Sequence, residues 1–208
     1  MADSIPLIIT AWVALATAAI SPGPNLVAVA SRALGAGRKS ALMVALGIAF
    51  GAFGWSFLTA VGLGALFGAY PALLRILGVV GGLYLLWLGI KGWRAAMTGS
   101  GGQIAPVAGS NALHSFLHGL LVTATNPKVA LLWASLSTFV GPAITSWLML
   151  LVFTSGSAVI IFTIYGIYGL LFSTGGVRGV YGRFQRRCEA VFGTIFGVLG
   201  VFMVNRSI

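Results

Sequence analysis

Two short proline-containing stretches interrupt otherwise apolar runs of the sequence, and both could do chemistry inside a membrane. The first is Ser21-Pro22-Gly23-Pro24-Asn25 and the second is Thr125-Asn126-Pro127-Lys128. Proline has no backbone N–H and clashes with the carbonyl four residues earlier, so each stretch breaks a helix and frees backbone groups that lipid cannot satisfy. Such helix ends offer partial charges to a bound molecule. We therefore interpret both stretches, with all their residues, as one substrate-binding site; the alternative is a pair of ordinary proline kinks.

Lys128 adds a positive charge directly after the second break. An ammonium in the middle of a bilayer is costly unless something compensates it. The chain has only two carboxylates, Asp3 and Glu189, and neither falls within an apolar run. A lysine in this place is neutral, snorkels to the interface, or binds an anion. The carboxylate of a small substrate would be such an anion, which makes Lys128 a candidate ligand for it.

The elements that position these residues are apolar helices. Of the 208 residues, 59% are hydrophobic and 7% are charged, and the mean hydropathy is +1.04, values typical of an integral membrane protein. A helix needs about 20 apolar residues to cross the bilayer. Stretches of about this length lie at 7–31, 40–66, 71–90, 113–140, 144–172 and 190–205. The first is longer than a signal-peptide core and has Asp3 in front of it, so we expect it to be retained.

Basic residues follow a pattern of their own along the chain, which has a formal net charge of +10. They gather on alternate connections between the apolar stretches, while the connections near 67–71 and 141–142 carry none. The basic connections hold Arg32, Arg38 and Lys39, then Lys91 and Arg94, then Arg178, Arg183, Arg186 and Arg187. Because cytoplasmic loops are enriched in Lys and Arg, we predict a multi-pass inner-membrane protein with both termini on the outer, periplasmic side. The charge therefore reports membrane orientation and does not indicate a nucleic-acid partner.

The stretch 97–110, rich in Gly, Ser and Ala, divides the chain into halves with three apolar stretches each. We predict an all-α integral membrane protein whose six transmembrane helices form two inverted three-helix repeats, 1–103 and 104–208, within one membrane domain. Each break falls in the first helix of its half, roughly 20 Å from where that helix enters the bilayer at about 1.5 Å per residue. Both breaks are therefore expected near mid-membrane, where transporters with broken helices bind their substrates.

Five motifs resemble those of the LysE/RhtB family of amino-acid exporters. They are SPGPNL at 21–26, GAGRKSALMVALGIAFG at 35–51, GGLYLLWLGIK at 81–91, FLHGLLVTATNPKVALLW at 116–133 and FGTIFGVLG at 192–200. The resemblance extends over nearly the whole chain and implies an inner-membrane carrier that exports amino acids or related small metabolites with the proton gradient. Many members carry an aspartate directly after the PGP motif, where this chain has Asn25. A proton could then be carried by Glu189, by Lys128, or by no residue if a cationic substrate follows the membrane potential.

Enzymatic chemistry and cofactor binding find little support in the sequence. His114 and His118 share a helix face, but zinc sites use three or four protein ligands, so we predict no metal and no cofactor. The single cysteine, Cys188, cannot form an internal disulfide. Intramembrane polar residues gather at the two breaks, which favours a carrier over a passive channel or a membrane scaffold subunit. Close glycine pairs such as Gly47 and Gly51 are expected to pack helices within one chain, although the same spacing would suit a homodimer face.

Overall fold

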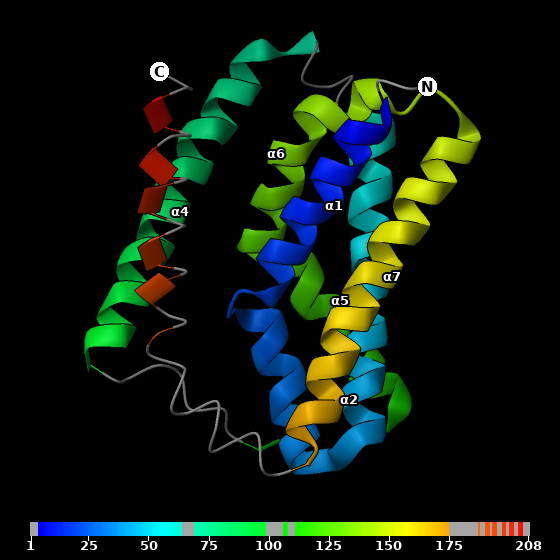
Figure 1. The fold of residues 1–208 in the computed structure, drawn as a ribbon, viewed down its shortest axis with the longest axis vertical. Coiled ribbons are helices and arrows are strands. Elements are labelled where there is room, and N and C mark those ends of the chain that lie inside the picture. Colours follow the sequence, from blue (N-terminus) through cyan, green and yellow to red (C-terminus); the bar gives the residue numbers. More distant parts are fainter. Residues whose placement is uncertain are drawn as a thin grey trace. The chain divides into compact units, whose positions relative to one another are not determined.

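The computed structural model describes residues 4–63, 69–98, 106–107 and 111–174, with single and paired residues between 187 and 205. Every element in this part of the chain is a helix, as predicted (Figure 1). The helices are α1 (Ser4–Ile20), α2 (Pro24–Leu58), the π-helix η1 (Thr59–Leu63), α4 (Pro71–Thr98), α5 (Ala112–Thr125), α6 (Pro127–Ala143) and α7 (Trp147–Phe172). They belong to two compact units, one of residues 1–68 and 105–175, the other of residues 69–104 and 176–208.

The two interrupted apolar stretches are each built from two helices. The predicted span 7–31 corresponds to α1 and the start of α2, and the predicted span 113–140 corresponds to α5 and α6. By length and hydropathy, Pro24–Gly62 and Trp147–Phe172 are each long enough to cross a membrane, and α1 and α5 are shorter apolar helices. The helical breaks are therefore confirmed, while the count of six spans and the inverted repeat remain predictions.

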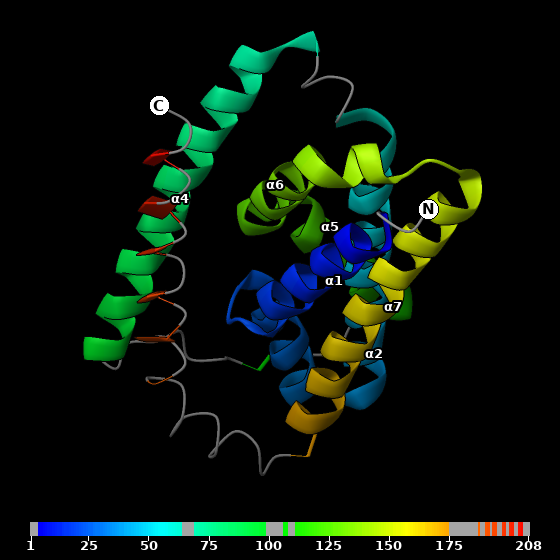
Figure 2. The same cartoon turned by 45° about the horizontal axis from the view of Figure 1, so that its top comes forward.

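The helix α2 consists of two arms joined by a reversal at Gly37. This residue has φ 78° and ψ −175°, a backbone conformation that favours glycine. Val29 on the first arm and Ala41 on the second both face Gly169 of α7, since a Cβ placed on Gly169 would lie 3.4 Å and 3.1 Å from their side chains. The chain turns back at the lower end of α2, and α7 runs beside it in both views (Figures 1 and 2). The reversal falls in the basic connection predicted between the first two spans.

Two glycines let the second arm of α2 approach α5 closely. A Cβ on Gly47 would overlap the carbonyl of Phe116, and a Cβ on Gly119 would overlap the carbonyl of Val44. Gly51 faces the side chain of Thr123 in the same interface. The prediction that Gly47 and Gly51 pack helices within one chain is therefore confirmed. This close contact fixes the position of α5 along the second arm of α2, and with it the position of the second break, which directly follows α5.

The starts of the helices follow two different patterns. Asn111 and Ser146 cap α5 and α7, because their side chains accept hydrogen bonds from backbone N–H groups three residues later, at 2.7 Å and 3.3 Å. The helices α2 and α6 instead begin with Pro24 and Pro127, a residue well suited to the first helical position. Proline thus ends the helix before each break and begins the helix after it.

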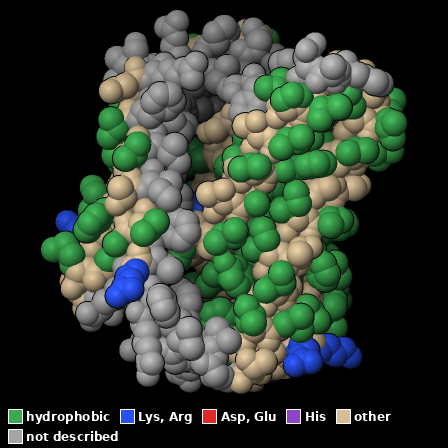
Figure 3. All heavy atoms as spheres, viewed as in Figure 1, with side chains coloured by type: hydrophobic (Ala, Val, Ile, Leu, Met, Phe, Trp, Pro, Cys, Tyr) green, Lys and Arg blue, Asp and Glu red, His purple; other side chains and the backbone are tan. Residues whose placement is uncertain are grey.

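Hydrophobic side chains cover the outer face of α1 and α7, and Lys and Arg side chains gather at the end where α2 reverses (Figure 3). The exposed hydrophobic residues of these two helices include Val13 of α1 and Leu148, Leu151 and Val159 of α7. An apolar face of this extent is what contact with lipid requires.

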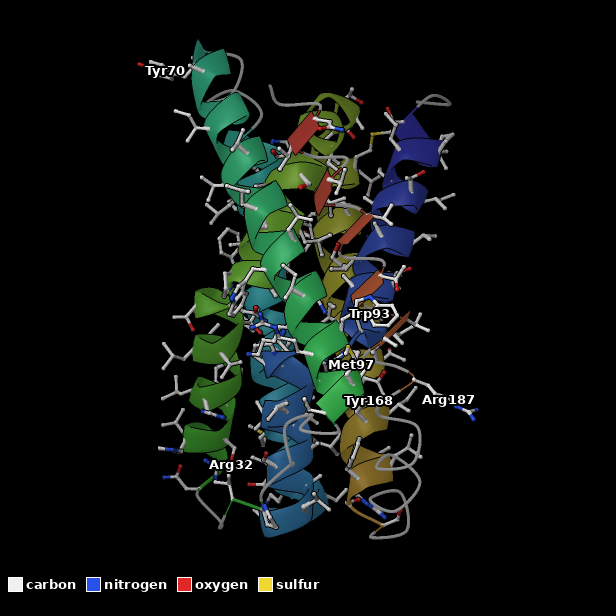
Figure 4. All side chains as sticks on the ribbon, turned by 90° about the vertical axis from the view of Figure 1, so that its left-hand side faces the viewer. Arg32, Tyr70, Trp93, Met97, Tyr168 and Arg187 are labelled. Atoms are coloured by element: carbon white, nitrogen blue, oxygen red, sulfur yellow. The ribbon has the colours of Figure 1, made fainter. Side chains whose placement is uncertain are left out.

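In the second unit, α4 lies close to Gly193 and Gly197. A Cβ on Gly89 of α4 would lie 2.8 Å from the backbone N of Gly197. Tyr70 stands just before α4, and Trp93 and Met97 lie toward its other end (Figure 4). Aromatic residues near both ends of an apolar helix are typical of membrane interfaces.

Candidate substrate-binding site

The first break leaves two carbonyls of α1 without their usual backbone partners. In a continuous helix, the N–H groups of residues 22 and 24 would donate to the carbonyls of Ala18 and Ile20, four residues earlier. Both positions are occupied by prolines, Pro22 and Pro24, which have no N–H to donate. Carbonyls inside a membrane protein need another donor, so the partners of these two define the surroundings of the break.

Side chains from two other helices bond these two carbonyls. The Nζ of Lys128, at the start of α6, lies 2.8 Å from the carbonyl oxygen of Ala18. The hydroxyl of Tyr168, on α7, lies 3.1 Å from the carbonyl oxygen of Ile20. Lys128 Nζ also lies 2.8 Å from the hydroxyl of Ser21 and 3.2 Å from its carbonyl. The end of α1 is therefore held by one residue of α6 and one of α7.

Lys128 therefore has hydrogen-bonding partners within the protein, and those that the structure describes are not carboxylates. The hydrogen-bonded partners are neutral oxygens at the C-terminal end of α1, where the helix dipole favours a cation. The residue types in the sequence do not reveal these partners, because they are two backbone carbonyls and one hydroxyl, and only the Ala18 carbonyl is released by a proline. Such oxygens solvate the ammonium but do not cancel its charge.

Two asparagines join the second break to the first. The Nδ2 of Asn126 donates to the Oδ1 of Asn25 at 3.0 Å, and both residues are buried. The Oδ1 of Asn126 accepts the backbone N–H of Lys128 at 3.1 Å, at the start of α6. Tyr165 of α7 forms a side-chain hydrogen bond with Asn25. The structure thus brings together four of the predicted site residues, namely Ser21, Asn25, Asn126 and Lys128.

A cavity of about 30 Å³ lies beside the joined breaks, which is room for about two water molecules. Gly23 belongs to its wall, and aliphatic side chains such as Leu15 and Ile161 form much of the rest. The polar residues that line the cavity are Asn25, Thr123, Asn126, Lys128, Trp133 and Tyr165. A small space with mixed polar and apolar walls is suited to a small amphipathic molecule once it widens.

Three polar residues of this wall, Thr123, Trp133 and Tyr165, are not among those predicted from the sequence. Trp133 comes seven residues after Asn126, which is about two helical turns and places both on one face of α6. That spacing could have identified it. Tyr165 carries no comparable signal, because it reaches the site from α7 through tertiary packing alone.

The remaining predicted residues lie at the edges of the site. Thr125 is exposed, and its hydroxyl donates to the carbonyl of Leu121 in its own helix at 2.8 Å, so Thr123 lines the cavity instead. Pro24 and Pro127 are exposed, and their role is to begin α2 and α6. Glu189 lies outside the described residues.

Comparison with known proteins places this chain among translocators. A family model described as "LysE type translocator" matches residues 16–207. The threonine efflux protein of Escherichia coli K12 is 30% identical over 192 residues, which cover 90% of this chain and 92% of that protein. The leucine efflux protein of Enterobacter sp. strain 638 is 33% identical over 115 residues, 55% of this chain and 54% of that protein. YahN, an uncharacterised membrane protein of Escherichia coli K12, is 27% identical over 190 residues, 90% of this chain and 84% of that protein.

No solved structure matches the chain significantly. The family match covers both breaks and nearly the whole sequence, so it applies to the site as well as to the fold. The resemblance inferred from the sequence motifs is therefore confirmed: the chain belongs to the LysE type translocator family and is a transporter rather than an enzyme.

Proposed function

We propose that this protein is a secondary active transporter that exports amino acids across the inner membrane. The substrate's carboxylate binds where the two broken helices meet. The observation that carries the proposal is the convergence of both breaks on Lys128 beside a cavity. The efflux proteins of threonine and leucine named above support amino acids as the substrate class and export as the direction.

The electrostatics of the site favour a carboxylate as ligand. Among the described residues, the oxygens that bond the Lys128 ammonium carry no formal charge. The only side-chain carboxylates in the sequence are Asp3 and Glu189, close to its two ends. The N-terminus of α6 adds a partial positive charge at the same place. An incoming carboxylate would replace the carbonyls of Ala18 and Ser21 as hydrogen-bond acceptors of the Lys128 ammonium.

This exchange links substrate binding to movement of the helices. The cavity holds only about two water molecules, far less than the volume of an amino acid, so loading requires the end of α1 to move away from α6. Lys128 bonds α1 in the structure and would bond the substrate after that movement. Binding would thus favour a different arrangement of the two breaks, as alternating access requires.

The proton gradient is the proposed energy source, with Lys128 or Glu189 as the residue that carries the proton. Asn25 cannot serve this purpose because an amide does not titrate, and it is hydrogen-bonded to Asn126. An imposed pH gradient should therefore drive transport in the wild-type protein. The variant Glu189→Gln, which has no carboxylate at this position, distinguishes the two candidates. If its transport still follows the pH gradient, Lys128 carries the proton; if the coupling is lost, Glu189 carries it.

A counterflow assay in proteoliposomes tests the proposal. Vesicles loaded with threonine, leucine or another amino acid should accumulate the labelled amino acid, and the uptake should saturate. Amino-acid amides and decarboxylated amines should neither be carried nor compete, because both lack the carboxylate. Absence of exchange for every amino acid tested would contradict the proposed substrate class, and uptake that does not saturate would indicate a channel.

A further inference from the structure

Trp133 buries a hydrogen-bond donor that finds no acceptor in the described part of the chain. The residue is 0% exposed, and its Nε1 has no hydrogen-bond partner there. Indole N–H is a donor only, so nothing but an acceptor can satisfy it. Native proteins rarely leave such a group unpaired unless it has a function or binds water. Because Trp133 lines the cavity, a ligand there could supply the missing acceptor.

Trp12, which also contacts α7, behaves differently. The Nε1 of Trp12 lies 3.1 Å from the hydroxyl of Ser157 and 3.4 Å from the carbonyl of Phe153. Trp133 also contacts Phe153, edge to face with ring centroids 6.1 Å apart and an interplanar angle of 84°. Its ring is therefore held by packing in the core, while its N–H remains available.

Thr123 shows the same pattern on the other side of the second break. It is 1% exposed, and its hydroxyl has no hydrogen-bond partner among the described residues. Threonines in these helices usually bond the carbonyl four residues earlier, as Thr154 does to Leu150 at 2.8 Å and Thr125 to Leu121 at 2.8 Å. Thr123 does not use this option, and it lines the same cavity.

We propose that Trp133 and Thr123 are substrate-binding residues, a role that rests on the proposed function. The Trp133 N–H donates to one oxygen of the substrate's carboxylate while Lys128 binds the other. The Thr123 hydroxyl accepts a hydrogen bond from the substrate's ammonium. The ligand class is an α-amino acid, whose two charged groups satisfy the donor and the acceptor together.

The test removes each polar group in turn: Thr123→Val keeps the shape of the side chain, whereas Trp133→Phe also shortens the ring and needs a tryptophan control. Trp133→Phe should raise the KM for amino-acid counterflow at least about tenfold, because a hydrogen bond to a charged group is lost. Its melting temperature without substrate should fall, because the smaller ring leaves space in the core, so the KM is compared only once the variant is shown to be folded. The matched control Trp12→Phe removes an N–H that already has a protein partner and should keep the wild-type KM.

Thr123→Val provides a second, independent arm. It should raise the KM and reduce the thermal stabilisation that amino acids confer, whereas Thr154→Val should change neither. If Trp133→Phe does not fold, the Thr123→Val variant alone tests whether these residues bind substrate. Wild-type KM values in both Thr123→Val and a folded Trp133→Phe would overturn the inference while leaving the proposed function intact. A wild-type protein that carries no amino acid would instead contradict the proposed function itself.

Discussion

Lys128 combines two tasks that are usually separate, since it caps the end of one helix and carries the charge of a binding site. Its Nζ bonds the carbonyl left free by Pro22, so the amine replaces a backbone N–H that proline lacks. Tyr168 does the same for the carbonyl left free by Pro24. The two prolines of the first break therefore explain why a lysine and a tyrosine from distant helices meet there.

Lys128→Met should abolish transport and also lower stability, by about 1–3 kcal/mol, because it leaves the Ala18 carbonyl and the Ser21 hydroxyl without their donor. Lys128→Arg should recover part of the stability but little transport, since a planar guanidinium can bond carbonyls yet does not fit where a compact ammonium does. Thermal unfolding in detergent and counterflow in vesicles measure the two effects. A Met variant as stable as the wild type would contradict the capping role.

The sequence predicted the residues of the breaks better than their partners. Prolines and a lone lysine in an apolar run are visible without a structure, and so is the lack of nearby carboxylates. The acceptors of Lys128 are mostly backbone carbonyls, which every residue has, so no residue type marks them. Trp133 and Tyr165 were overlooked because tryptophan and tyrosine in apolar helices usually pack in the core or anchor an interface.

At the scale of elements, the interruption between α1 and α2 depends on missing N–H groups. Pro22→Ala would restore a donor for the Ala18 carbonyl, allow α1 to continue, and compete with Lys128 for its acceptor. We expect a folded protein with transport reduced at least about tenfold, given a lost hydrogen bond to a charged group. Pro6→Ala is the control, because Pro6 lies in the first turn of α1, where no helical partner is lost. Equal transport by the Pro22 and Pro6 variants would mean that the first break is an ordinary proline kink with no role in transport.

The contact between α2 and α5 offers a sharp test of packing. Gly47→Ala should destabilise the protein strongly, because its Cβ would overlap the Phe116 carbonyl and force the two helices apart. Gly54→Ala, in the same arm of α2, should be neutral or slightly stabilising, since nothing lies within 4 Å of a Cβ there. Thermal unfolding of both variants in detergent checks the difference. Similar melting temperatures would mean that the helices are not held this closely.

At the scale of the whole molecule, two helix pairs of the first unit support the predicted inverted repeat. The second arm of α2 runs parallel to α5: Ser40 bonds Ser115 at 2.9 Å, and Gly51 meets Thr123 further along both helices. An inverted repeat exchanges the first span with the fourth and the second with the fifth. The second arm of α2 belongs to the second span and α5 belongs to the fourth. The exchange turns their contact into one between the fifth and first spans, so the repeat requires a parallel contact there as well.

That second contact is present between α1 and α7. Trp12 bonds Ser157 at 3.1 Å, and the carbonyl of Ile20 bonds Tyr168 at 3.1 Å further along both helices. The sequence could suggest this symmetry through the two breaks and the odd number of spans per half. It could not specify the residues in contact, because 30 glycines offer many close-packing positions.

The alternating basic connections predict the membrane orientation, and reporter fusions test it. A reporter that works only outside the cytoplasm should be active after Ile208 and inactive within 178–187. The basic residues Arg38 and Lys39 are exposed beside the reversal of α2, as a cytoplasmic connection requires. The opposite reporter pattern would invert the orientation of the transporter and place both termini in the cytoplasm.

The uncharged oxygens that bond Lys128 in the described part of the chain also bear on ion leakage. Carbonyl dipoles hold its ammonium much as those of a selectivity filter hold a potassium ion, but this cation is tethered to the chain. A sodium or potassium ion entering from either side would meet a fixed like charge in surroundings of low dielectric constant. Opening to one side therefore need not dissipate the cell's ion gradients. Vesicles that contain the protein should hold an imposed potassium gradient as long as protein-free vesicles do, even while amino acids exchange.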